Sequence, residues 1–391
     1  MMRFIRKSKC KFIVGAVLIS CIGSIAAVSG AQDVSTDTAE ITAESGTSVE
    51  VYTTVRKTGQ YPERFVVTYP EGMEAESLSA EDFHFEGQAS KWGDSSLHEL
   101  TCEFADLQED RNVLTLIPDQ FPEKFFYVEE WQVSCSSDPA FSFDSTMITG
   151  LYTETADRFE TFEDIERGYI WHRFTPDSGE PCPVVVVFHG YGDTSNLLTY
   201  RTSVAWAEES WQADHPCFVI SPVIDDASYF RPERRYEIFE GVHDEIGKLI
   251  EEGKADADRI YVMGNSFGGM SSLEYAEKYP DETAAVLALC PAVSFSAAAI
   301  KHLPLIKDIP VWFAHAEHDR TISVNDSKNA YNHLIEAGST KARITVYTDE
   351  EMEACGAELS SESTYSFHHV ELAVMEDPEY MEWMFEQLQN G

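Results

Sequence analysis

The chain of 391 residues is poor in cysteine and in basic residues, and each shortage narrows the range of functions. Its eight cysteines include no Cys-x-x-Cys pair, so the sequence indicates neither a zinc site nor a disulfide-dense scaffold. Only 28 lysines and arginines stand against 68 aspartates and glutamates, which gives a formal net charge of -40. We therefore expect neither nucleic acid nor an anionic membrane surface as a partner. The carboxylates are dispersed, as on a solvated surface, and we expect no metal and no cofactor.

Six of the cysteines follow the N-terminal segment and are spread thinly. Proximity along the chain suggests Cys102 with Cys135 and Cys182 with Cys217 as disulfide pairs, although sequence alone does not determine a pairing. Cys290 follows an apolar run, so we predict that it is a buried free thiol.

The first 31 residues are typical of a signal peptide. Five basic residues lie within positions 3–11, an apolar run follows over 12–28, and small residues lead to position 31. Two other interpretations remain open, a lipidated Cys21 after a lipoprotein-like box at 18–21 and an uncleaved membrane anchor. The short apolar core with glycines favours cleavage. We expect a secreted or cell-surface protein with no integral membrane span after processing. Residues 32–48, which follow the signal peptide, are polar and are expected to form a flexible leader.

Residues 49–151 consist of short segments that alternate apolar and polar side chains between turn residues. This pattern predicts a small antiparallel β-sandwich without long helices. No catalytic constellation is evident in it. Trp92 and Trp131 are the aromatics that could bind a polysaccharide, but aromatics in a small sandwich usually pack in its core.

From residue 152 onward, apolar runs that suit buried strands alternate with helical patterns. The residues at 236, 239, 242, 246 and 249 are apolar or aromatic, which predicts an amphipathic helix packed on a sheet. Such alternation is typical of an α/β domain with a mostly parallel sheet covered on both faces. Functional loops are then expected at the carboxyl ends of the strands.

The most informative motif is Gly-x-Ser-x-Gly at residues 264–268, which follows an apolar stretch and precedes a helical one. This strand-turn-helix context is typical of a nucleophile elbow, in which Ser266 adopts a strained backbone and presents its hydroxyl. An apolar run at 183–188 ends in His189-Gly190-Tyr191-Gly192, the position of an oxyanion loop. We predict that the backbone N–H groups of Tyr191 and Phe267 bind the oxyanion and that His189 holds the loop.

An acid and a base should follow Ser266 in that order. Asp319, after the apolar run 309–314, is the predicted acid, with Glu317 and Asp326 as weaker rivals. Only three histidines lie beyond Asp319, and the first, His333, falls inside a helical pattern. The pair His368 and His369 precedes the last helix, which Asp377 caps with Pro378 at its first position. One of this pair is the predicted general base, and the residue pattern alone leaves both open.

The chain from about residue 173 to the C-terminus resembles a family of secreted bacterial α/β-hydrolases, carboxylesterases related to feruloyl esterases and polyhydroxybutyrate depolymerases and often described as peptidases. The stretches that carry the resemblance are 188–192, 256–261 leading into the elbow, 309–319, and 377–379 leading into Trp383. In that family the catalytic histidine stands fifteen positions before this tryptophan, which implies His368 with His369 as the alternative. The sequence departs from the family at Glu371, where relatives carry an aromatic residue, and at Asp193, where they carry glutamate.

The resemblance extends more weakly to residues 49–151, where the phrase at 77–83 is similar to the immunoglobulin-like domain that precedes the hydrolase in some of these esterases. It implies an α/β-hydrolase catalytic domain over 152–391. The expected function is that of a secreted serine carboxylesterase acting through an acyl-enzyme on small-molecule or polysaccharide-linked esters, with acyl groups on plant polysaccharide among them. A serine peptidase of the prolyl-oligopeptidase type and an exported non-catalytic binding protein on a hydrolase fold are the alternatives. The oligomeric state is not readable from the sequence.

Overall fold

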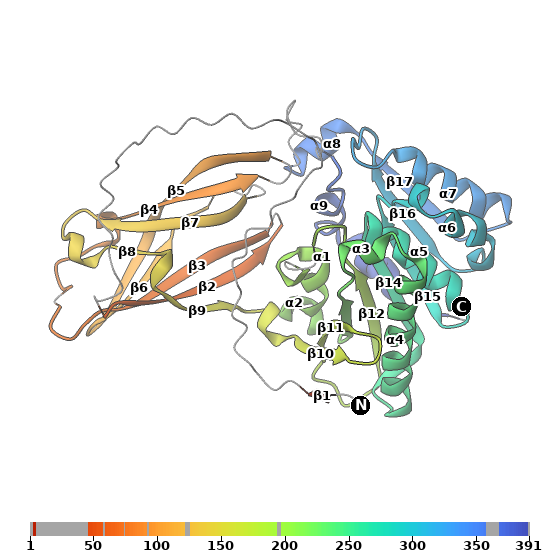
Figure 1. The fold of residues 1–391 in the computed structure, drawn as a ribbon, viewed down its shortest axis with the longest axis horizontal. Coiled ribbons are helices and arrows are strands. Elements are labelled where there is room, and N and C mark those ends of the chain that lie inside the picture. The colour runs from red at the N-terminus through yellow and green to blue at the C-terminus, as the bar shows by residue number, and fades with distance from the viewer. Residues whose placement is uncertain are drawn as a thin grey trace, which may run out of the picture.

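The protein is described by a computed structural model that covers residues 3–4, 46–57, 59–73, 75–91, 94–121, 126–193, 197–356 and 367–389. The predicted signal peptide and leader lie outside these residues, apart from the short strand β1 (Arg3–Phe4), which pairs with β10 (Glu160–Asp164), and residues 46–48. Figure 1 shows a β-sandwich beside a larger part with helices around a central sheet.

The sandwich is an eight-stranded assembly with the order β8-β7-β4-β5-β6-β3-β2-β9. Its strands are β2 (Ser48–Arg56), β3 (Gly59–Thr68), β4 (Phe83–Lys91), β5 (Asp94–Asp110), β6 (Val113–Pro118), β7 (Phe126–Cys135), β8 (Phe143–Asp144) and β9 (Ile148–Thr153). The long strand β5 pairs with β4 at one end and with β6 at the other, so it joins two layers. Phe65 from one layer packs on Phe85 and Trp131 from the other at ring distances of 6.1 and 5.3 Å.

The alternating pattern of β2 explains this packing, because every second residue from Val49 onward is buried. Trp131 is partly buried and packs against the sandwich core, which agrees with the packing role that the sequence suggested, whereas Trp92 lies outside the described residues. The last strand ends at Thr153, two residues beyond the predicted boundary. The immunoglobulin-like assignment of this sandwich stays a prediction.

The second sheet has nine strands in the order β1-β10-β11-β13-β12-β14-β15-β16-β17. Its further strands are β11 (Tyr169–Phe174), β12 (Cys182–Phe188), β13 (Phe218–Pro222), β14 (Ala255–Asn265), β15 (Thr283–Leu289), β16 (Val311–Ala316) and β17 (Ala342–Tyr347). The six strands from β13 to β17 in this order are parallel, and β11 joins them antiparallel. Central strands β12 and β15 are buried along their whole length, which is why their sequences are continuous apolar runs.

Helices cover both faces of this sheet (Figure 1). One apolar core includes residues of α4 (Pro232–Glu251), α5 (Phe267–Lys278), α6 (Ala297–His302) and α7 (Val324–Glu336). The core on the opposite face includes residues of α1 (Arg201–Val204), α8 (Asp349–Ala354), α9 (Glu371–Val374) and α10 (Pro378–Phe385). Short helices α2 (Glu209–Gln212) and α3 (Asp226–Tyr229) complete the set of α-helices in the described chain. Asp377 caps α10 as predicted, since its side chain accepts the N–H of Glu379.

The two predicted disulfides are wrong, because the structure holds all four cysteines as free thiols. Cys102 on β5 and Cys135 on β7 flank β4, so their backbones are separated by two strand spacings, about 10 Å, which no disulfide spans. Cys182 and Cys217 belong to the apolar cores on opposite faces of the sheet, so their side chains point apart.

Cys290 is fully buried, as the sequence predicts. Among the helices of the described chain, none is long and apolar enough to cross a membrane.

Candidate active site

Ser266 lies at the carboxyl end of β14, directly before the first residue of α5. Its backbone has φ 57° and ψ -119°, a conformation that costs about 1–3 kcal/mol in a residue other than glycine. The Ser266 N–H donates to the carbonyl of Leu289 at 2.9 Å and its carbonyl accepts the N–H of Ala292 at 3.0 Å. These bonds to the neighbouring strand end hold the strained turn in place.

The glycines on either side of Ser266 are required by close backbone contacts. A Cβ at Gly264 would lie 2.4 Å from the carbonyl oxygen of Phe188, and one at Gly268 would lie 2.0 Å from the same atom. Both values are far below contact distance, so α5 can begin this close to β12 only because both residues lack a side chain. The Gly-x-Ser-x-Gly spacing is thus a consequence of how the helix packs on the sheet.

His189 begins the loop that follows β12 and is buried. Its Nε2 accepts the N–H of Ile224 at 2.9 Å, so the proton is on Nδ1, which donates to the carbonyl of Gly190 at 2.6 Å. Burial lowers the pKa of His189 to about 4, which keeps the ring neutral. This geometry suits the loop-holding role that the sequence predicts for His189.

The two predicted oxyanion donors lie at the start of α5 and in the loop after β12. Phe267 is the first residue of α5, where backbone N–H groups have no partner within the helix. Tyr191 follows Gly190 in the loop after β12, and its ring packs 5.8 Å from that of Phe267. The structure therefore brings the two predicted donors next to each other, with Phe267 directly after Ser266.

Asp319 follows β16 and contacts His368 from the segment before α9. His368 Nδ1 lies 2.7 Å from Asp319 Oδ2, and both side chains are buried. The other carboxylate oxygen accepts the N–H groups of Thr321 and Ile322 at 2.7 and 2.9 Å. Burial by itself would raise the pKa of Asp319, but hydrogen bonds from His315 and His368 outweigh it and hold the pKa well below its usual range.

The rival acids are placed elsewhere. Glu317 is exposed, and Asp326 lies in the first turn of α7, where it accepts the N–H of Ser294 at 2.9 Å. Within the described part of the chain, neither carboxylate forms a hydrogen bond or ion pair with a histidine. The sequence interpretation missed His315, whose Nε2 lies 3.0 Å from the carbonyl of Ile322 and 3.2 Å from Asp319 Oδ2. Only its place four residues before Asp319 could have indicated this contact.

His369, the alternative base, pairs with a different carboxylate. Its Nδ1 lies 2.9 Å from Glu371 Oε1, and the histidine is buried. Burial opposes protonation of this ring, but the charge of Glu371 and its hydrogen bond outweigh that effect and raise the pKa of His369. Asp193 is also buried nearby, and burial together with the charge of Glu371 raises its pKa to about 7. Asp193 Oδ2 accepts the N–H of Gly190 at 3.1 Å, so this second cluster is tied to the oxyanion loop.

Cys290 links the serine and histidine segments. It directly follows Leu289, the residue that accepts the Ser266 N–H, and its thiol donates to the His368 carbonyl at 3.3 Å. One ligand atom from each of Cys290, Asp319 and His368 lies within 4.8 Å of the others, a spacing that could hold a metal ion. Burial and the charge of Asp319 raise the pKa of the Cys290 thiol well above its usual range, which makes it a poor metal ligand. We assign these atoms to the serine site.

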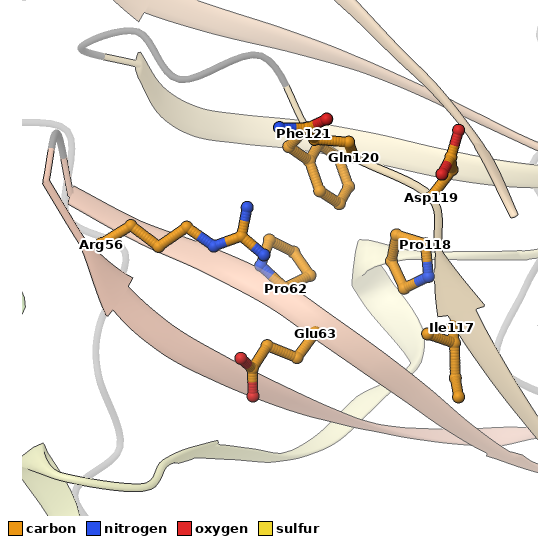
Figure 2. Close-up of a pocket in the computed structure, with 8 residues that line it drawn as sticks. All are labelled: Arg56, Pro62, Glu63, Ile117, Pro118, Asp119, Gln120 and Phe121. Atoms are coloured by element: carbon orange, nitrogen blue, oxygen red, sulfur yellow. The ribbon is translucent and has the colours of Figure 1, made fainter. Parts of the chain in front are cut away.

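A separate hollow lies on the sandwich and is shown in Figure 2. It is lined by Arg56, Pro62, Glu63, Ile117, Pro118, Asp119, Gln120 and Phe121. These residues include no serine, cysteine or histidine, so they offer no nucleophile and base of the kind found near Ser266.

Comparison with known proteins supports the fold. A family model described as phospholipase/carboxylesterase matches residues 226–367, a stretch that includes Ser266 and Asp319 and ends one residue before His368. The structure of a thermostable esterase aligns with a TM-score of 0.65 and 23% identity over 87% of this chain and 99% of its own. None of the curated proteins compared with the chain matches it.

The C-terminal part has an α/β-hydrolase fold. The order of its strands, with one antiparallel strand beside the parallel set and Ser266 after the central β14, agrees with that assignment. The aligned share of 87% exceeds the share of the chain that follows Thr153, so the likeness to the thermostable esterase includes part of the sandwich. More distant likenesses are an acylaminoacyl peptidase of Pyrococcus horikoshii (TM-score 0.45, 12% identity, 84% of this chain and 62% of that one) and Est1E from Butyrivibrio proteoclasticus (0.42, 12%, 58% and 98%).

Proposed function

We propose that the protein is a serine hydrolase of carboxylic esters that works through an acyl-enzyme. The observation that carries this proposal is the 2.7 Å contact between His368 and Asp319 on the same sheet edge as the strained Ser266. A hydroxyl on a turn of this kind, with a histidine held by a buried carboxylate, is the arrangement that acyl transfer requires. The phospholipase/carboxylesterase match over residues 226–367 also supports an ester as the substrate.

In the first step the Ser266 hydroxyl attacks the ester carbonyl while His368 Nε2 takes its proton. The Asp319 bond to Nδ1 leaves Nε2 as the atom that accepts this proton, and the carboxylate stabilises the imidazolium that forms. The N–H groups of Tyr191 and Phe267 bind the negative oxygen of the tetrahedral intermediate. Collapse of the intermediate breaks the bond to the alcohol, which leaves with the proton from His368.

In the second step water attacks the acyl-enzyme. His368 accepts a proton from the water, and the intermediate collapses to release the acid and return the proton to Ser266. Asp319 remains ionised throughout, because its pKa is held well below the usual range of a carboxyl group. No cofactor enters either step.

The site of action and the natural substrate are further parts of the proposal. A basic segment followed by an apolar run at residues 3–28 supports export to the cell exterior. Acidic composition supports an uncharged ester, either a small molecule or an acyl group carried on polysaccharide, over an anionic polymer.

The proposal can be tested by labelling the purified protein with a fluorophosphonate and mapping the modified peptide. Modification of Ser266, together with hydrolysis of short p-nitrophenyl esters that Ser266→Ala abolishes, is the expected result. Ser323 offers a matched control, because it is a surface serine that caps α7, and its alanine variant should retain both properties.

The alternative functions give different outcomes in the same experiment. A serine peptidase would be labelled at Ser266 but would hydrolyse peptide substrates in preference to esters. A non-catalytic binding protein would show neither labelling nor turnover, and this result would refute the proposed function.

A further inference from the structure

Four aromatic side chains form a continuous surface beside Ser266, which we call the aromatic rim: Tyr191, Phe230, Phe267 and Phe295. Phe267 lies at its centre, with ring distances of 5.8 Å to Tyr191, 5.4 Å to Phe230 and 5.1 Å to Phe295. The three outer residues come from separate loops, which follow β12, α3 and β15. Ring contacts between loops so far apart in the sequence require the tertiary fold.

The outer rings are unusually exposed for aromatic side chains. Tyr191 is 46% exposed and Phe230 and Phe295 are each 58% exposed, while Phe267 beneath them is buried. Single exposed apolar side chains are common, but adjoining exposed rings next to a reactive group indicate a ligand surface. These rings would bury their free faces against a substrate held on Ser266.

The loops that carry the rim are held by buried hydrogen bonds. Tyr229 packs 5.1 Å from Phe267, and its hydroxyl donates to the His189 carbonyl at 2.5 Å. Arg235 donates to the Tyr229 carbonyl and forms a buried ion pair with Glu274 of α5, with N–O distances of 2.8 and 2.9 Å. Phe230, the residue after Tyr229, is therefore attached to a rigid base, and the rim is pre-formed.

The rim and the candidate base lie on different sides of Ser266. Phe267 and Tyr229 belong to the apolar core on one face of the sheet, with Phe188. Phe367 and Val370, which flank the two histidines, belong to the core on the other face. Ser266, at the carboxyl end of β14, therefore lies between the rim and His368.

This arrangement decides which half of an ester meets the rim. The tetrahedral carbon on Ser266 carries an oxyanion, an acyl substituent and an alcohol oxygen. The alcohol oxygen must face His368, because it receives its proton from that ring. The oxyanion faces the N–H groups of Tyr191 and Phe267, and the acyl substituent takes the remaining direction, away from His368 and along the exposed rings of the rim.

Charge near the rim restricts the acyl group further. Asp226 lies beside it, with Oδ1 accepting the N–H of Gly192 at 2.9 Å, and Asp225 caps the same short helix α3. Hydrogen bonds from Ser228 outweigh the effect of burial and lower the pKa of Asp225, so this carboxylate is ionised near neutral pH. These two carboxylates would repel an anionic acyl group, and the exposed Arg231 that follows Phe230 offsets part of this repulsion.

We infer that the aromatic rim is the acyl-binding subsite and that it selects uncharged aromatic acyl groups over short aliphatic ones. This inference rests on the proposed function, because it assigns one half of an ester to a surface beside the proposed nucleophile. Stacking and edge contacts with a flat ring would strengthen binding beyond simple apolar burial.

The test uses boronic acids, which form a tetrahedral adduct with an active serine and carry their substituent in the acyl position. We expect 2-phenylethylboronic acid to inhibit the full chain at least about 10-fold more strongly than methylboronic acid. Phe295→Ala and Phe230→Ala should each reduce this ratio several-fold. Leu305→Ala is the matched control, because Leu305 is 60% exposed but precedes β16 and so lies toward the opposite edge of the sheet.

A second experiment uses ester substrates to test which half of an ester contacts the rim. Methyl 3-phenylpropanoate carries it on the acyl side and 2-phenylethyl acetate on the alcohol side, with methyl acetate as the reference. For each of the two esters that carry a ring, the measured quantity is its kcat/KM divided by that of methyl acetate. We expect Phe295→Ala to lower this ratio more for methyl 3-phenylpropanoate than for 2-phenylethyl acetate.

Two results would overturn the inference: an unchanged boronic acid ratio in both rim variants, or a larger loss for the alcohol-side ring. Failure of the proposed function looks different, since then neither boronic acid binds and no fluorophosphonate labels Ser266 in the unaltered protein.

Discussion

Two adjacent histidines in this protein have different environments, although both are buried and both contact a carboxylate. His368 contacts Asp319 at 2.7 Å and His369 contacts Glu371 at 2.9 Å. Asp319 also accepts two backbone N–H groups, which stabilises its charge. Glu371 Oε2, in contrast, has no hydrogen-bond partner among the residues that the structure describes.

The difference shows that the surroundings of the carboxylate, more than the pairing itself, prepare a histidine for proton transfer. A carboxylate that is fully hydrogen-bonded stays ionised and orients its partner in one tautomer. The cluster of His369, Glu371 and Asp193 instead places two carboxyl groups near one ring, and the pKa of Asp193 rises to about 7. We therefore expect the first pair to serve catalysis and the second to hold the oxyanion loop against the histidine segment.

The largest predicted effect comes from removing the two histidines one at a time. We expect His368→Ala to reduce kcat for a short ester about 10⁵-fold, because the base for Ser266 is lost. His369→Ala should reduce it less than about 10-fold. Steady-state kinetics of both purified variants checks this, and equal losses would contradict the comparison.

Replacing the carboxylates should give the same ranking with a smaller effect. Asp319→Asn should lower kcat about 10⁴-fold, because an amide donates to Nδ1 and favours the wrong tautomer of His368. Glu371→Gln keeps the size of its side chain and should lower kcat less than about 10-fold. If Glu371→Gln proves as harmful as Asp319→Asn, the assignment of the two pairs is reversed.

Only one of the two histidines can serve Ser266 if the turn around Ser266 holds its hydroxyl in a fixed direction. Gly268→Ala should destabilise the fold by about 3 kcal/mol or more, because its Cβ would lie 2.0 Å from the Phe188 carbonyl. Gly247→Ala in α4 is the control, since a Cβ there meets no atom within 4 Å, and it should be neutral or stabilising by up to about 1 kcal/mol. Chemical unfolding of both variants measures the difference, and similar stabilities would refute the close approach.

The two carboxylate environments should respond to pH in opposite directions. The raised pKa of Asp193 means that its contribution to stability is present below about pH 4 and is lost as pH rises to about 7. The raised pKa of His369 also stabilises the fold at low pH, and this contribution is lost as the pH rises above the ordinary pKa of histidine. The lowered pKa of Asp319 means that its contribution is present above about pH 4 and is lost on acidification.

Unfolding free energies of wild type and Asp193→Asn at pH 4.5 and 7.5 test this smallest effect. We expect the stability of Asp193→Asn relative to the wild type to rise by about 3 kcal/mol from pH 4.5 to pH 7.5, because the asparagine does not titrate. The general influence of the net charge cancels in this difference. A constant difference across the range would show that Asp193 is an ordinary ionised carboxylate.

Much of the fold was predictable because its signals are local. The apolar run at 183–188 corresponds to β12, and the periodic residues 236–249 lie within α4. The elbow was predictable for the same reason, since two glycines around a serine between a strand and a helix describe one turn. The residue pattern left His368 and His369 open, the resemblance to the esterase family implied His368, and the structure brings this residue to Asp319.

Contacts between distant segments were not predictable in this way. The disulfide pairs failed because Cys102 and Cys135 flank an intervening strand, and Cys182 and Cys217 face opposite sides of a sheet. These errors share a cause, because the side of a sheet and the order of its strands are set by pairing between remote segments.

The amino-acid sequence alone determined the strand–turn–helix around Ser266, the alternation of strands and helices, and the acidic surface, because each depends on neighbouring residues or on composition. Only the tertiary structure decided which carboxylate each histidine meets and which rings gather at the rim. Asp319 and His368 are 49 positions apart. Their meeting depends on the parallel order of β14, β15, β16 and β17, which brings the strand ends to one edge.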